Sequence, residues 1–280
     1  MNEGADQAAL RRRFDAIAET FDEHAALVRE VGSRLLERLD GLRFSPRQIA
    51  DLGCGTGHQT LALHERFSEL PILALDQSRG MLAQARRRRG RWRPKYALVE
   101  ADFHTLPLAE ASVDLVHACL SLQWSDRLEA TLRGLRRIMR PGGLVLVALN
   151  GPDTLTELSQ TGAVIDCGNA CHAQELGDRL TRAGFQEPVL DTDWLTLSYS
   201  HIGDLLADLD HLGIGYSLPD DPESLESQLP RNAEGALIVT WEVVYASAWS
   251  PDEGQPIRTE RGEEASVSIS SLGIRRRPGD

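Results

Sequence analysis

The sequence predicts an α/β fold in which a mainly parallel sheet carries helices on both faces. Short apolar runs of strand length alternate with segments whose apolar residues follow helical spacing, over most of the 280 residues. A glycine-rich loop joins the first of these runs, at residues 49–52, to a helical segment. Strands that alternate with helices favour a parallel sheet, and such sheets bind ligands outside the carboxyl ends of their strands.

Three glycines, Gly53, Gly55 and Gly57, stand at alternate positions directly after Asp51 and Leu52. Glycine adopts backbone conformations that are closed to other residues and lets a ligand approach the main chain closely. The spacing is neither the Gly-x-Gly-x-x-Gly of dinucleotide folds nor that of a phosphate loop. The segment resembles motif I of the class I methyltransferases, which bind S-adenosylmethionine (SAM). A tight turn without a ligand is the alternative.

Two later strands also end in a carboxylate. A buried-type strand ends at Asp76, about twenty residues after the glycine loop. If the resemblance holds, an acid there accepts hydrogen bonds from both ribose hydroxyls. Residues 96–101 run into Asp102 and Phe103, which would place an acceptor beside the adenine amino group and an aromatic ring near its face. Each acid alone is typical of an ordinary strand end, but together with the acid before the glycine loop they favour a cofactor site.

The remaining elements complete the doubly wound pattern. Further strands are predicted at 113–118, 144–149, 188–199 and 236–249, and helices at 127–139 and 173–183. A Pro-Gly-Gly turn at 141–143 cannot continue a helix and should release the chain into the next strand. Helical spacing over 8–39 predicts two helices or one broken helix. We expect a helical cap at 1–45 and a methyltransferase domain at 46–280, with a lid inserted at about 200–235.

A more specific resemblance begins with Leu120-Ser121-Leu122-Gln123-Trp124 and extends to other segments. These are residues 74–77, 81–86, 140–143, 151–158 and 240–246. From about Phe14 to the C-terminus the chain is similar to the BioC family, the malonyl-acyl-carrier-protein O-methyltransferases of biotin synthesis. The resemblance implies a Rossmann-like seven-stranded class I methyltransferase sheet with N-terminal helices and a helical lid insertion. It also implies a partner, an acyl-carrier protein that carries malonyl-phosphopantetheine, whose free carboxylate is esterified.

The chemistry that the resemblance implies requires positioning rather than proton transfer. A carboxylate with a pKa of about 4 is ionised at neutral pH, so its attack on the SAM methyl needs no general base. Phe21, Gln123 and Trp124 are expected on the substrate side, although core packing explains Trp124 equally well. The residues expected to bind SAM are Asp51, Gly53, Cys54, Gly55, Asp76, Gln77, Met81, Asp102, Phe103, Cys119 and Leu120.

Two segments depart from the family pattern. Residues 21–28 lack the tyrosine hydroxyl and the glutamine amide of the family's Tyr-x-x-x-Ala-x-Leu-Gln type segment. Ala170 stands where the family has an arginine that is expected to pair with the malonyl carboxylate. We expect poor turnover of malonyl-carrier protein unless another cation, such as Arg179 or Arg182, has taken that role, and Ala170→Arg should then raise turnover.

Two other function classes remain as alternatives. Glu260-Arg261-Gly262 and Val267-Ser268 are similar to mitochondrial relatives of this family that assemble respiratory complex I and hydroxylate a protein arginine. A noncatalytic paralogue that binds SAM or a partner protein is the third class. It is disfavoured because the chain keeps all three strand-end acids.

Composition excludes several classes of protein. A formal net charge of −12 argues against nonspecific nucleic-acid binding, which needs a basic surface. No apolar run approaches the roughly 20 residues of a membrane span, and the N-terminus lacks the apolar core of a signal peptide. The four cysteines lack the spacing of a zinc site, so no metal is expected. We expect a cytoplasmic monomer that binds no membrane.

Charge is unevenly distributed along the chain. Residues 86–95 hold seven cations, whereas 204–234 hold eight acids and one arginine. Cations are favourable at a helix C-terminus, which explains part of the basic run. A docking surface for an acidic partner is the second interpretation.

Overall fold

The structure, a computed structural model, describes residues 3–68, 70–254, 257–259 and 262–264. The C-terminal residues Glu260, Arg261, Val267 and Ser268, which carry the similarity to arginine hydroxylases, lie outside this part of the chain. No helix among the described residues is long and apolar enough to cross a membrane. Near the C-terminus, β10 (Ile257–Thr259) pairs antiparallel with β11 (Gly262–Glu264).

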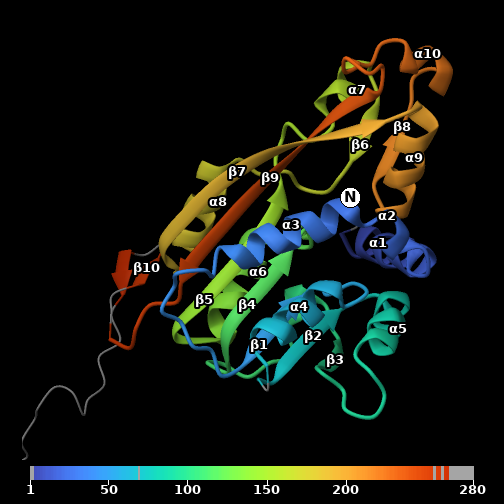
Figure 1. Cartoon of the computed structure of the whole chain (residues 1–280). Coiled ribbons are helices and arrows are strands. Elements are labelled where there is room, and N and C mark those ends of the chain that lie inside the picture. The colour runs from blue at the N-terminus through green and yellow to red at the C-terminus, as the bar shows by residue number, and fades with distance from the viewer. Residues whose placement is uncertain (1–2, 69, 255–256, 260–261, 265–280) are drawn as a thin grey trace, which may run out of the picture.

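Seven strands form the central sheet in the order β3-β2-β1-β4-β5-β9-β7 (Figure 1). The first five strands in this order are parallel to one another, and β9 runs antiparallel to both β5 and β7. The prediction of a mainly parallel seven-stranded sheet is therefore confirmed. The strands are β1 (Ile49–Leu52), β2 (Ile72–Asp76), β3 (Ala97–Glu100), β4 (Val113–Cys119), β5 (Met139–Asn150), β7 (Gln186–Tyr199) and β9 (Leu237–Trp249).

Helices cover both faces of this sheet and give three layers. Leu35 of α3 packs in one buried cluster with Ile49 of β1, and Leu132 of α6 packs in a second cluster with Ala50. Because Ile49 and Ala50 are adjacent in a strand, their side chains point to opposite faces. The helices of the two outer layers are α3 (Ala26–Glu37), α4 (His58–Arg66), α5 (Arg79–Arg88), α6 (Leu128–Ile138) and α8 (Ala173–Arg182).

Strand β5 begins earlier than the sequence predicts. Helix α6 ends at Ile138 and β5 starts at Met139, so the Pro-Gly-Gly segment lies inside the strand. The pairing of β4 with β5 shifts in register between Val113 and Leu115. Such an irregularity accommodates proline, which has no N–H to donate to the ladder. The predicted turn is therefore an irregular start of the strand.

Three helices precede the sheet, rather than the predicted two helices or one broken helix. They are α1 (Glu3–Ile17), α2 (Phe21–His24) and α3. The Asp15 carboxylate of α1 accepts hydrogen bonds from Ser78 Oγ (2.6 Å) and Gly80 N (2.8 Å), at the start of α5. Since this point follows the carboxyl end of β2, the first helix covers that edge of the sheet (Figure 1).

The sequence predicts a helical lid, but the lid in the structure also contains a strand. Strand β8 lies between its two helices and pairs antiparallel with β6, which belongs to the stretch after β5. Strands of three residues are too short to leave a periodic signal in the sequence. The lid consists of α9 (Ile202–His211), β8 (Gly215–Ser217) and α10 (Pro222–Glu226). The stretch after β5 contributes α7 (Thr156–Gln160) and β6 (Val164–Asp166). The domain boundary at residue 45 stays a prediction.

Candidate active site

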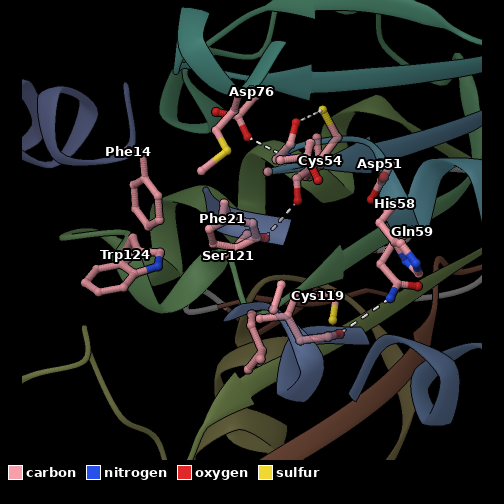
Figure 2. Close-up of a pocket in the computed structure, with 18 of the residues that line it drawn as sticks. Phe14, Phe21, Asp51, Cys54, His58, Gln59, Asp76, Cys119, Ser121 and Trp124 are labelled. Atoms are coloured by element: carbon pink, nitrogen blue, oxygen red, sulfur yellow. Dashed lines mark hydrogen bonds between the residues drawn. The ribbon is translucent and has the colours of Figure 1, made fainter. Parts of the chain in front are cut away.

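A cavity lies at the carboxyl ends of β1, β2 and β4, against the N-terminal helices (Figure 2). It contains about 1240 Å³ of empty space, part of which is open to solvent. Every residue expected from the sequence to bind SAM or substrate lines this cavity, except Asp102. The lid contributes Leu212 and Ile214, which the sequence did not single out.

The three glycines of the loop after β1 serve different purposes, although all have positive φ. A Cβ on Gly53 would lie 2.3 Å from Ser121 Cβ, and one on Gly57 would lie 2.4 Å from the Tyr96 hydroxyl. A Cβ on Gly55 would meet no protein atom within 4 Å. Gly53 and Gly57 are therefore required by packing, whereas the space beside Gly55 is open for a ligand.

Asp51, near the end of β1, stabilises the start of the glycine loop through buried polar contacts. Its carboxylate accepts a hydrogen bond from Thr60 Oγ1 (2.5 Å) and lies 2.8 Å from His117 Nδ1. Both Asp51 and His117 are buried, and His117 Nε2 has no hydrogen-bond partner among the described residues. Asp51 thus joins β1, β4 and α4 beneath the cavity. His117, to which the sequence gave no site role, holds this carboxylate in place.

Asp76 lies at the end of β2, where the sequence placed it. Its two carboxylate oxygens accept hydrogen bonds from Gly55 N (2.9 Å) and Ser78 N (2.8 Å). Burial raises the pKa of Asp76 to about 6, although the two backbone hydrogen bonds oppose this rise. Because each carboxylate oxygen can accept more than one hydrogen bond, the side chain can still receive two ligand hydroxyls.

The structure does not bring Asp102 into the cavity. Asp102 Oδ1 accepts a hydrogen bond from His104 N (2.8 Å) and lies 2.7 Å from His104 Nδ1. The side chain therefore caps the short helix η1 (Phe103–Thr105), which is a common role for aspartate. Asp102 therefore does not line this cavity, whereas the adjacent Phe103 does.

Aromatic side chains enclose the part of the cavity away from the glycine loop. The rings of Phe14 and Trp124 meet edge to face, with centroids 5.6 Å apart (Figure 2). Gln123, beside Trp124 in helix η2 (Leu122–Trp124), is buried, and its Oε1 has no partner among the described residues. Trp241 donates to Asn150 Oδ1 (2.9 Å), and both line the cavity. Asn150 lies at the end of a strand, so its place at the site could have been predicted from the sequence. Trp241 lies in the middle of a strand, which gives no such indication.

Ala170, the position where a carboxylate-binding arginine was expected, is exposed and does not line the cavity. The neighbouring Asn169 instead supports η2, since its backbone N–H donates to Gln123 O (2.7 Å). Arg179 and Arg182, the two cations expected to replace that arginine, do not reach the cavity either. Arg179 pairs with Glu175 (2.6 Å) within α8, and neither Arg179 nor Arg182 lines the cavity. No simple rule predicts from the sequence whether a residue in a loop away from the carboxyl ends of the strands, such as Ala170, reaches the site.

Among the described lining residues, the side chains that can be cationic are Arg29 and His58. His58 begins α4 directly after the glycine loop, and the backbone oxygen of Arg29, in α3, lies 3.4 Å from Gln59 Nε2 of α4. Neither residue was expected from the sequence to line the site. Burial first, and then the charges of Arg88 and Arg29, lower the pKa of His58. The only available signal was that Arg29 follows directly after the segment expected to cover the cofactor.

The basic run divides between structural and free cations. Arg88 forms an ion pair with Asp22 and donates to Thr56 O (3.0 Å), both of which line the cavity. Arg89 donates to Tyr96 O (3.2 Å). Five other cations form no ion pair within the described chain, namely Arg86, Arg87, Arg91, Arg93 and Lys95. Trp92, in their midst, is 91% exposed.

Cys54 and Cys119 line the cavity as buried free thiols. Burial raises the pKa of each thiol above its usual range. Because only the thiolate is a good nucleophile or metal ligand, these side chains serve as walls. The described residues contain no group of three or more His, Cys, Asp or Glu that could hold a metal ion.

Known proteins resemble this chain over nearly its full length. A family model described as a methyltransferase domain matches residues 49–143. The malonyl-[acyl-carrier protein] O-methyltransferase of Xylella fastidiosa is 40% identical over 293 residues, which covers 99% of this chain and 99% of that protein. The enzyme of the same name from Halorhodospira halophila is 38% identical over 290 residues, covering 97% and 96%.

A solved structure shows the same fold at low identity. Phosphoethanolamine N-methyltransferase 2 of Haemonchus contortus, in complex with SAM, has a TM-score of 0.52 and 17% identity, covering 79% of this chain and 52% of that one. The fold is that of the class I methyltransferases, while the two near-full-length relatives decide the family. This chain belongs to the malonyl-[acyl-carrier protein] O-methyltransferase family.

Proposed function

We propose that this protein is a SAM-dependent O-methyltransferase that esterifies the free malonyl carboxylate on the phosphopantetheine arm of an acyl-carrier protein, in biotin synthesis. The observation that carries the proposal is the 40% identity, over 99% of both chains, to a protein of that name. Every residue proposed to contact SAM, apart from Asp102, lines one cavity. The biotin pathway and the carrier protein come to this chain from its family.

The residues of the cavity fit SAM. The open space beside Gly55 admits a ligand against the loop backbone, and Asp76 supplies an acceptor at the end of the neighbouring strand. Met81 and Phe103 provide apolar surface for the adenine. When bound, SAM supplies a methyl group that is electrophilic because it is attached to a sulfonium. Asp102 is withdrawn from the proposed set of cofactor contacts.

The protein's own contribution is orientation and the exclusion of water. An ionised carboxylate needs no general base, so no residue has to accept a proton. Phe21, Gln123 and Trp124 would hold the substrate in line with the methyl. Correct alignment of two reactants is worth up to about 7–11 kcal/mol. Leu212 and Ile214 of the lid would close the apolar side of the site.

The alternatives are not favoured by the relatives. The two most extensive matches described above are both named as O-methyltransferases. The residues that carry the similarity to arginine hydroxylases lie mostly outside the described chain. We therefore keep one proposed function, and the monomeric state stays a prediction.

One experiment tests the proposal directly. The protein is incubated with SAM and malonyl-carrier protein, and the carrier is weighed by mass spectrometry. A mass gain of one methylene unit is expected, with acetyl-carrier protein as the control that lacks a free carboxylate. No gain on the malonyl carrier, from a protein that binds SAM, would refute the proposed substrate.

The free cations of the basic run are the proposed contact for the acidic carrier protein. Reversing charge at Arg86, Arg87 and Arg91 should slow turnover of carrier-bound substrate by about tenfold at low salt, because surface charges act mainly on encounter rate. SAM affinity should stay unchanged. Arg89 is left intact, since it donates to Tyr96 O. Equal turnover by the variant and the wild type, at subsaturating carrier, would exclude this surface.

A further inference from the structure

Arg29 is a half-buried cation in the cavity wall that lacks an acidic partner among the described residues. Its Nη1 donates to Asp22 O (2.7 Å), which holds the guanidinium against the start of α2. A guanidinium has five N–H donors and accepts no hydrogen bond. Burying such a group partly, without a counter-charge, is unfavourable unless a ligand supplies one.

The other arginines of the same helix are paired. Arg34 contacts both Glu30 (2.8 Å) and Asp193 (3.0 Å), and hydrogen bonding to Asp193 is the main cause that raises the pKa of Arg34. Arg38, where α3 ends, contacts Asp191 (2.6 Å). Within α3, then, the arginine that lines the cavity is the one without a carboxylate.

The acid closest in sequence, Asp22, is already engaged. Its Oδ1 accepts a hydrogen bond from Thr56 Oγ1 (2.6 Å), and its Oδ2 pairs with Arg88. Burial lowers the pKa of the neighbouring His58, and the charges of Arg88 and Arg29 add to this shift. Asp22 and Glu65 oppose that shift, but less strongly. An anion in the cavity would therefore be stabilised at this point.

We propose that Arg29 binds a carboxylate of a ligand in this cavity. The inference rests on the proposed function, under which two ligands carry such a group: the methionine part of SAM and the malonyl arm. Gln59 Nε2 lies within 3.4 Å of Arg29 O, which places Arg29 at the glycine-loop side. Figure 2 shows Gln59 and His58 on the opposite side of the view from Phe14 and Trp124. This position favours the methionine carboxylate.

The test compares Arg29→Gln with Arg34→Gln, a matched control on the same helix that removes an equal charge outside the cavity. Calorimetry measures the affinity for S-adenosylhomocysteine and for 5′-methylthioadenosine, which lacks the amino-acid carboxylate. Because Arg29→Gln removes a charge-assisted hydrogen bond, its affinity for S-adenosylhomocysteine should fall about tenfold or more. Its affinity for methylthioadenosine should stay unchanged. Arg29→Lys, which keeps the charge, should lose less.

A second measurement separates the two carboxylates. If S-adenosylhomocysteine affinity is unchanged but KM for malonyl-carrier protein rises about tenfold at saturating SAM, Arg29 holds the malonyl carboxylate instead. The proposal is overturned if neither value changes, if methylthioadenosine weakens equally, or if Arg34→Gln has the same effect. Thermal unfolding checks that each variant folds. The binding measurement decides about Arg29 even if the wild type fails to methylate malonyl-carrier protein.

Discussion

The sheet-side wall of the cavity, made of the glycine loop, Asp76 and Phe103, consists of backbone and side chains that directly follow strands. The cap-side wall consists of Phe14, Phe21, Arg29 and the lid residues Leu212 and Ile214, which come from helices and loops far apart in the sequence. The first wall is a product of local βα connections. The second exists only because distant segments meet.

The two walls are also held together differently. Gly55 N donates to Asp76, and Cys54 N donates to Leu75 O (3.0 Å), so the sheet-side wall is part of the main hydrogen-bonded sheet edge. The cap side is joined to the lid by side-chain contacts and not by a strand ladder. His24 Nδ1 lies 2.6 Å from Asp208 Oδ1, and the His24 ring stacks on that of His211. Segments with few cooperative contacts open at low free energy. We therefore expect ligands to enter by movement of the cap-side wall.

Removal of Asp76 tests the sheet-side wall and should have the largest effect. Asp76→Ala deletes two hydrogen bonds to the proposed ribose, each worth about 1.5–3 kcal/mol, so affinity for S-adenosylhomocysteine should fall about hundredfold or more. Calorimetric titration of the folded variant measures this. Asp102→Ala, which alters a strand-end acid outside the cavity, should change affinity by about twofold at most. Unchanged affinity in Asp76→Ala would remove this carboxylate from the site.

The raised pKa of Asp76 makes the same wall sensitive to pH. Since the pKa is about 6 in the folded protein, Asp76 adds stability that is fully present below about pH 4 and is lost as pH rises through 6. Ligand hydroxyls need the ionised form, so S-adenosylhomocysteine affinity should rise about tenfold from pH 5 to pH 7. Asp76→Asn should abolish this dependence. A wild-type affinity that stays flat over this range would contradict the assignment.

The contact between Arg88 and Asp22 tests the cap-side wall. Arg88→Gln should loosen α2 from the glycine loop and speed amide hydrogen exchange over residues 21–28 by about fivefold, corresponding to about 1 kcal/mol for a partly exposed ion pair. Mass spectrometry of the exchanged peptides measures the rate. Arg87→Gln is the control, because among the described residues that side chain hydrogen-bonds Gln84 alone, on its own helix. Equal exchange in both variants would show that the pair does not hold the cap.

Ala170→Arg should have the smallest effect. The sequence predicted that an arginine at this position would raise turnover, but Ala170 is exposed and outside the cavity. We now expect kcat/KM for malonyl-carrier protein to change by about twofold at most, as for other surface substitutions. Steady-state kinetics with the same carrier and SAM concentration checks this. A clear gain in turnover would mean that residues 168–171 approach the substrate during the reaction.

The sequence by itself determined the sheet-side wall. A strand, a Gly-x-Gly-x-Gly loop and a helix form one local unit, and the parallel sheet brings the ends of neighbouring strands to one edge. Gly55, Asp76 and Phe103 were expected at the site because they lie at strand ends, and Gln123 because of the family resemblance. All four line the cavity, and their contacts with SAM or substrate stay predictions. The same rule does not bring Asp102 into the cavity, because a local hydrogen bond from His104 N engages its side chain.

Only the tertiary structure decided which charges face the ligand from the cap side. Whether Arg29 lines the cavity depends on how α3 is rotated against α4, which its own spacing does not specify. In the lid, β6 pairs with β8 across about fifty residues of sequence. Ala170 lies outside the site, beside Asn169, whose backbone N–H donates to Gln123 O. Such contacts depend on the packing of segments that are distant in sequence, whereas a strand-end residue is placed by the hydrogen bonds of its own strand.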